Sequence, residues 1–91
     1  MEPNERHTIE QNLHSIAVQK QAVQQQLMEV DLALKELTNT ANAYRMVGNL
    51  LIQTPVASLT EELHKKKETV HTRMQLLERQ EEKLKAKLHE Q

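Results

Sequence analysis

Residues 43–54 read AYRMVGNLLIQT, and this segment holds the only tyrosine and the only glycine of the 91-residue chain. Residues 43–47 and 50–54 have the composition of two short strands, because aromatic and β-branched residues favour strands and concentrate nowhere else in the chain. Between them, Gly48-Asn49 supplies the positive φ angles that a two-residue hairpin turn requires. The segment therefore favours a β-hairpin over the alternative, an irregular loop.

Upstream of this hairpin, apolar residues recur in alternating steps of four and three, which is the spacing of a coiled-coil seam. Thr8-x-x-Gln11 has the form of a capping box and predicts a helix start, so we expect a helix over residues 9–41. One slot of the seam is polar, because Lys20 fills it. The seam residues are Leu13, Lys20, Leu27, Leu34 and Ala41 at position a, and Ile9, Ile16, Val23, Val30 and Leu37 at position d.

A second seam follows the hairpin and is half polar at its a positions. Ser58-x-x-Glu61 resembles another capping box just after Pro55, so we expect a second helix over residues 59–89. Glu81 occupies an a position near the free end, where we expect it to be hydrated. The seam residues are Leu63, Val70, Leu77 and Leu84 at d, and Lys67, Met74, Glu81 and Leu88 at a.

Two helical rods of similar length predict an antiparallel pair with both termini at one end. The fold class is therefore all-α dominated: a long antiparallel two-helix coiled coil joined by a short β-hairpin, in a single domain over residues 1–91. Composition agrees, because only 37% of the residues are apolar and one is aromatic. That supply of large apolar side chains is too small for the core of a compact globule.

Several function classes are not expected. The one basic cluster, Lys65-Lys66-Lys67, is flanked by glutamates in a chain of net charge −1, so no nucleic-acid-binding face is expected. Without cysteine, disulfides and thiolate metal sites are excluded. No apolar run reaches the length of a membrane span and no signal-peptide core is present, so we expect a cytoplasmic protein without a membrane partner. The chain has no phosphate loop, no close spacing of metal ligands and no set of acid, base and nucleophile. Neither a cofactor nor an enzymatic activity is therefore expected.

The hairpin predicts an assembly. An isolated two-stranded ribbon is marginal in water, and its outer edges carry unpaired backbone groups. The apolar seams of the two helices are expected to pack against each other, so the helices cannot cover those edges. We therefore expect the hairpin to pair with hairpins of other subunits and to close a sheet or a β-barrel.

Several segments of this layout resemble the β-type subunits of prefoldin. The first helix contributes Gln19-Lys20-Gln21-x-Val23, Leu27, Glu29 and Ala33-Leu34-x-Glu36-Leu37. The second contributes LERQEEKL at residues 77–84, the most specific match, and the likeness spans residues 16–88. The hairpin residues that carry the resemblance, and that we expect to mediate assembly, are Tyr44, Val47, Gly48, Leu50, Leu51 and Ile52.

The resemblance implies an ATP-independent molecular chaperone. One hairpin rather than two indicates the β type. The family pattern implies a hexamer of two α-type and four β-type subunits, or a six-protein eukaryotic version, in which hairpins form a β-barrel platform that carries six coiled coils. Unfolded client proteins would be held at the coiled-coil tips and delivered to a group II chaperonin.

The expected client-binding residues are the apolar ones at the free end of the coiled coil. Near a frayed end, Ile9, Leu13 and Leu88 are expected to be partly accessible, whereas Ile16 and Leu84 fit either ordinary core or tip surface. The alternative function is a structural coiled-coil scaffold or adaptor, which explains the heptads equally well but not the hairpin. The candidate tip residues are Ile9, Leu13, Ile16, Leu84 and Leu88.

Overall fold

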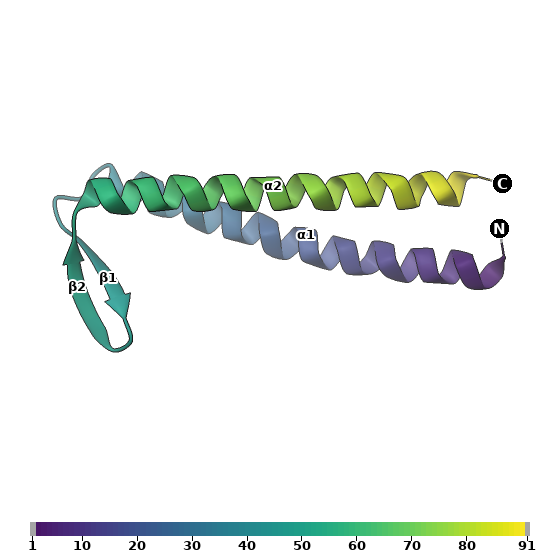
Figure 1. Ribbon diagram of the computed structural model, residues 1–91, viewed down its shortest axis with the longest axis horizontal. Coiled ribbons are helices and arrows are strands. Elements are labelled where there is room, and N and C mark those ends of the chain that lie inside the picture. The colour runs from purple at the N-terminus through teal and green to yellow at the C-terminus, as the bar shows by residue number, and fades with distance from the viewer. Residues whose placement is uncertain (1, 91) are drawn as a thin grey trace.

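The computed structural model describes residues 2–90 and has two long helices connected by a β-hairpin (Figure 1). The elements are α1 (Pro3–Leu37), β1 (Ala43–Val47), β2 (Leu50–Thr54) and α2 (Val56–His89). The helices run antiparallel, with both termini at one end of a body that measures 59 × 24 × 15 Å, and the hairpin projects sideways from the other end. The predicted fold class of coiled coil and hairpin is confirmed.

The start of α1 differs from the expected position. The helix begins at Pro3 instead of Ile9, with Glu2 as its N-cap and no side-chain capping hydrogen bond. Proline is suited to the first helical position, where its missing N–H is not needed and its φ is already helical. The predicted capping box is wrong, because Thr8 lies within the helix and donates its hydroxyl to the carbonyl of Asn4 at 2.9 Å.

The end of α1 also differs, because the helix stops at Leu37 and not at Ala41. The hydroxyls of Thr38 and Thr40 donate to carbonyl oxygens of the last turn at 2.7 and 2.6 Å. The backbone N–H groups of Thr38 and Asn39 donate to the same two carbonyls, so the threonine hydroxyls add side-chain hydrogen bonds to a tight last turn and favour termination there. Ala41 consequently lies outside the helix and is exposed, although it continues the heptad pattern.

The second helix begins directly after Pro55, at Val56 instead of residue 59. Pro55 is its N-cap and makes no side-chain hydrogen bond, so Ser58 lies inside the first turn and the second predicted capping box is also wrong. The helix ends at His89, as expected.

The heptad seam is confirmed as the contact between the helices. The d positions of α1 from Ile9 to Val30 are buried, and so are three seam residues of α2. The remaining seam leucines of both helices are half-buried. Val23 is the most deeply buried large side chain, with 2% of its surface exposed. Each such residue stabilises the pair by about 1.5–3 kcal/mol when fully buried. The buried seam residues are Ile9, Ile16, Val23 and Val30 on α1, and Val70, Met74 and Leu77 on α2.

The predicted β-hairpin is also confirmed. Its register pairs Ala43 with Thr54 and Val47 with Leu50, which leaves Gly48-Asn49 as the two-residue turn. Gly48 adopts a φ of +60°, a conformation that costs other residues free energy because of their Cβ atom. Asn49 does not adopt a positive φ, so only the glycine of the pair supplies the conformation expected for the turn.

Candidate functional site

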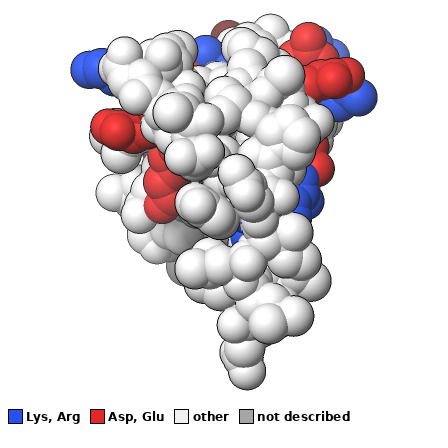
Figure 2. Space-filling model, turned by 90° about the vertical axis from the view of Figure 1, so that its left-hand side faces the viewer, with Lys and Arg blue, Asp and Glu red and all other residues white. Residues whose placement is uncertain are grey.

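The hairpin is an apolar surface that the rest of the chain does not cover. Every apolar side chain from Tyr44 to Ile52 is about half exposed or more, and Leu50 and Leu51 are each 67% exposed. Viewed from the hairpin end, the projecting part of the molecule is almost free of charged atoms (Figure 2). We call this surface the assembly hairpin. Its apolar residues are Tyr44, Met46, Val47, Leu50, Leu51 and Ile52.

Both faces of the assembly hairpin are apolar. Residues directly opposite each other in an antiparallel pair lie on the same face, and successive residues alternate between faces. Met46 and Leu51 therefore share one face, whereas Val47 and Leu50 share the other. Met46 is not among the residues that the sequence predicted for assembly, although its position two residues after Tyr44 places both on one face of the strand.

The base of the hairpin is tied to the coiled coil. Ala43 is buried, and Arg45 forms an ion pair with Glu62 of α2. The hydrogen bond from Arg45 lowers the pKa of the Glu62 carboxyl, so the pair stays charged near neutral pH. The hairpin thus leaves the rod at a set orientation while its outer half stays uncovered.

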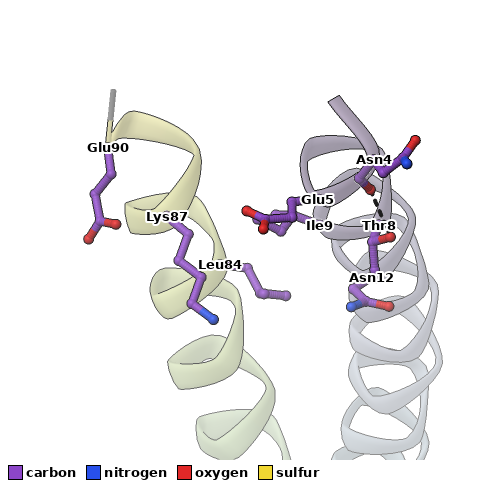
Figure 3. Close-up of a pocket in the computed structure, with 8 residues that line it drawn as sticks. All are labelled: Asn4, Glu5, Thr8, Ile9, Asn12, Leu84, Lys87 and Glu90. Atoms are coloured by element: carbon purple, nitrogen blue, oxygen red, sulfur yellow. Dashed lines mark hydrogen bonds between the residues drawn. The ribbon is translucent and has the colours of Figure 1, made fainter. Parts of the chain in front are cut away.

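At the opposite end of the rod, an open groove of about 890 Å³ lies between the helices. Figure 3 shows Ile9 of α1 and Leu84 of α2 pointing into the space between the helices. Ile9 and Leu84 form the apolar floor of the groove, and polar and charged side chains form its edge. The edge residues are Asn4, Glu5, Thr8, Asn12, Lys87 and Glu90.

A second groove of about 400 Å³ continues the first toward the middle of the rod. The two share Asn12, Leu84 and Lys87, and the second also reaches Ile16. Together they form one channel between the ends of the helices, which we call the tip groove. Three of its lining residues, Ile9, Ile16 and Leu84, belong to the apolar seam, so the groove is a local widening of the coiled-coil interface.

The structure places the five predicted tip residues at this end, but with unequal exposure. Leu13, Leu84 and Leu88 are half-buried. Ile9 is only 9% exposed, so the expectation that it is accessible is wrong. Because α1 begins at Pro3, Ile9 lies about 9 Å inside the helix end and points at α2. Ile16 is buried and belongs to the main apolar cluster.

The two polar a positions of the distal seam meet each other. Lys20 Nζ lies 3.2 Å from Glu81 Oε1, and Lys85 Nζ approaches the same oxygen at 3.6 Å. The side chains of Lys20 and Glu81 are only 25% and 19% exposed, which corrects the expectation that Glu81 is hydrated. The hydrogen bond from Lys20, with the charges of both lysines, lowers the pKa of Glu81. The heptad spacing identified Lys20 and Glu81 as polar residues within an apolar seam, but it did not predict that they contact each other.

Within residues 2–90, no group of three or more metal-ligating side chains is arranged to hold an ion. None of the described helices has the length and apolarity that crossing a bilayer demands. The two surfaces that stand out are therefore the assembly hairpin and the tip groove.

Comparison with known proteins places these features in a family. A family model described as "Prefoldin subunit" matches residues 3–91. The prefoldin subunit beta of Thermococcus onnurineus is 42% identical over 84 residues, which are 89% of this chain and 72% of that protein. The corresponding subunit of Pyrococcus horikoshii is 38% identical over 86 residues, or 91% of this chain and 74% of that protein.

A solved structure agrees with the sequence relatives. The crystal structure of the prefoldin beta subunit from Thermococcus strain KS-1 matches with a TM-score of 0.90 at 38% identity, covering 96% of this chain and 79% of that one. This chain and that subunit therefore share one fold, two long helices joined by a single hairpin, over nearly the whole length of this chain. The resemblance drawn from short sequence segments is confirmed: this chain belongs to the prefoldin subunit family and is similar to its β-type members.

Proposed function

We propose that this chain is the β-type subunit of an ATP-independent chaperone that holds unfolded proteins at its coiled-coil tips. In this proposal it assembles through its hairpin into a hexamer of two α-type and four β-type subunits in the cytoplasm. The hexamer passes its clients to a group II chaperonin. The observation that carries the proposal is the placement of two apolar surfaces at opposite ends of one rod, with the assembly hairpin at one end and the tip groove at the other.

The assembly half rests on the hairpin. Family membership supports assembly with other prefoldin subunits. The hairpin is a two-stranded sheet in the described chain, so each strand keeps one edge without a partner strand. Exposed edges and two apolar faces make a stable ribbon only when other strands cover them. Pairing with hairpins of neighbouring subunits satisfies the edges and buries Leu50 and Leu51 together.

A single pair of matched variants tests assembly. Leu51→Lys introduces a charge into the assembly hairpin, whereas Leu76→Lys introduces the same charge at a leucine of α2 that is 50% exposed. After mixing with an α-type subunit, Leu51→Lys should lose the hexamer in sedimentation velocity while keeping its helix content. Leu76→Lys should assemble normally. A full hexamer with Leu51→Lys would overturn the barrel arrangement.

The client-holding half rests on the tip groove. An unfolded chain exposes apolar side chains in many spacings, so it is held best by several weak and adaptable apolar sites. The half-buried Leu13, Leu84 and Leu88 offer apolar surface without opening the buried seam. Several tips on one platform raise the overall affinity through effective concentration, although each tip alone binds weakly.

The corresponding test removes apolar area from the tip without touching the main apolar cluster. Leu13→Gln with Leu88→Gln changes one residue on each helix, and neither residue belongs to that cluster. The control, Val18→Gln with Leu76→Gln, removes exposed apolar area elsewhere on both helices.

Suppression of aggregation of an unrelated unfolding protein, without nucleotide, is the measurement. The tip variant should lose about tenfold or more in apparent client affinity at unchanged hexamer mass, because the loss is repeated in every β subunit. The control should retain the activity of the parent. An assembled tip variant that holds clients as well as the parent would leave the scaffold function as the better explanation. The delivery step rests on family membership alone and is tested by binding of the loaded hexamer to a group II chaperonin.

A further inference from the structure

The hairpin projects sideways from one end of the rod and meets the helices in few contacts (Figure 1). A single residue, Pro55, separates the end of β2 from the start of α2, whereas residues 38–42 connect α1 to β1. In the two strands only Ala43, at the base, is buried. The angle between hairpin and rod therefore depends on a small joint between β2 and α2.

Pro55 makes the first attachment at this joint. Its ring fixes φ, which is −57° here. Its carbonyl oxygen accepts the backbone N–H groups of Ser58 and Leu59 at 3.1 and 3.2 Å, which orients that peptide group on the first turn of α2. Thr54 precedes the proline and is therefore restricted to extended backbone. The path from β2 into α2 thus has little torsional freedom.

The ion pair between Arg45 and Glu62 makes the second attachment. It is the only ion pair between the hairpin and a helix among residues 2–90. Arg45 lies two residues beyond Ala43 on β1, about 7 Å out from the base. Glu62 lies about 9 Å along α2 from Val56. The pair therefore closes a triangle whose other two sides are the strand and the helix, and a triangle resists bending at its corner.

The length of the rod magnifies any change at this corner. The helix α2 has 34 residues, so it is about 51 Å long. Rotation of the helix by about 10° at its base moves its far end by about 9 Å. The tip groove lies at that far end, so its position relative to the hairpin depends on the joint.

We propose that Pro55 and the Arg45–Glu62 ion pair set the angle between the hairpin platform and the coiled coil, and thereby the spacing of the tips in the assembly. The proposal rests on the proposed assembly through the hairpin and adds the residues that orient each rod on it. Arg45 and Glu62 are positioning residues. Their side chains are about half exposed, so the ion pair is weak enough to open and leaves each rod some play.

The test measures the angle within one subunit of the hexamer. The chain has no cysteine, so Asn49→Cys at the hairpin turn and Thr72→Cys on α2 carry the only two spin labels of a β subunit. Both native residues are exposed. The labelled chain is mixed with an excess of unlabelled chain and with an α-type subunit, so that a hexamer contains at most one labelled copy. Pulsed electron spin resonance then gives the distribution of distances between the labels.

Two neighbouring glutamates provide the variant and its matched control. Glu62→Gln removes the ion pair of the joint, whereas Glu61→Gln removes an ion pair with Lys65 that lies entirely within α2. Neither substitution touches the assembly hairpin. A separate label at His7→Cys, an exposed position near the tip, reports the tip-to-tip distances in hexamers in which every β subunit carries it.

We expect Glu62→Gln to broaden the hairpin-to-rod distribution about twofold at unchanged hexamer mass, because one of the two attachments is lost. The tip-to-tip distribution should broaden with it, and Glu61→Gln should leave both at the parent width. Exchanging the charges, Arg45→Glu with Glu62→Arg, should restore the parent width. Salt at about 1 M should broaden the parent distribution but not that of Glu62→Gln, because it screens exposed charges.

An unchanged hairpin-to-rod distribution in Glu62→Gln would overturn the proposal, and so would equal broadening by Glu61→Gln. Broadening at the joint without broadening between the tips would also overturn it. If the parent forms no hexamer, the proposed assembly fails, and the two labels in the unmixed chain still decide whether the ion pair sets the angle. Pro55→Ala tests the other attachment: combined with Glu62→Gln it should broaden the distribution further, and no added broadening would contradict the role of Pro55.

Discussion

Two adjacent leucines on α2 offer a direct measure of how much the coiled-coil seam stabilises the chain. Leu77 lies in the main apolar cluster and is 6% exposed, whereas Leu76 faces away and is 50% exposed. The same substitution to alanine at both positions changes the helix propensity equally and removes the same atoms. The difference between the two variants therefore isolates burial.

The expected magnitudes follow from this geometry. Leu77→Ala removes a side chain packed against residues that are themselves almost fully buried, so the site cannot easily refill, and the cost should be about 2–5 kcal/mol. Leu76→Ala should cost less than about 1 kcal/mol, because half of its surface already meets water and alanine is a better helix former. For a domain of this size, each kcal/mol lowers the melting temperature by about 4–8 °C.

Thermal unfolding followed by far-ultraviolet circular dichroism is the assay. Both variants are measured at the same protein concentration as the parent, with sedimentation velocity to verify the same oligomeric state, since assembly itself raises apparent stability. Leu77→Ala should melt at least about 8 °C below the parent, and Leu76→Ala within a few degrees of it. Equal shifts for the two variants would refute the assignment of the seam, because the buried and the exposed leucine would then be indistinguishable.

Three further outcomes are expected. Gly48→Val should destabilise the hairpin turn by about 1–2 kcal/mol through its positive φ alone, since no atom lies within 4 Å of the added Cβ; proteolysis of the turn measures this. Lys20 and Lys85 keep the pKa of folded Glu81 low, so the stability it contributes is full above the ordinary glutamate pKa and is lost as the pH falls through the lowered value. The melting temperatures of the parent and Glu81→Gln should accordingly converge on acidification. Lys67→Ala, which breaks an ion pair whose side chains are about half exposed, should change the free energy of unfolding by less than about 1 kcal/mol in a denaturant titration.

The sequence predicted the core because a coiled coil is defined by spacing. The heptad spacing can be read along the chain without knowledge of the fold, and it predicts Val23, Val30, Val70 and Leu77 as contact residues, which are buried between the helices. The hairpin was equally accessible, because Gly48-Asn49 is a local signal for a specific turn. The seam is predictable because its residues recur at a fixed period, and the turn is predictable because two adjacent residues determine it.

The features that sequence reasoning missed depend on competition or on pairing between distant residues. Helix ends were misplaced because Thr8 and Ser58 resemble caps, whereas Pro3 and Pro55 set the actual starts through their fixed backbone geometry. The position of Ile9 followed from that error, since an earlier helix start moved it inward from the end. The register of the two rods had to be known before Lys20 and Glu81 could be matched.

That register explains why the two polar seam residues occur together. In the observed alignment each satisfies the other at 3.2 Å, so neither is left as a partly buried charge. A slip of one heptad would place Lys20 beside the level of Met74 or Leu88, and Glu81 beside Leu13 or Leu27, so both charges would lose their partner. Uncompensated charge in a seam costs more than the apolar contacts that the slip preserves, which is how single polar a positions select one alignment of a coiled coil. The ion pair therefore costs some stability relative to an apolar layer, but it fixes the helix alignment that brings Ile9 and Leu84 together at the groove. The same alignment places the N-terminal end of α1 beside the C-terminal end of α2, and the tip groove requires this because residues of both helices line it.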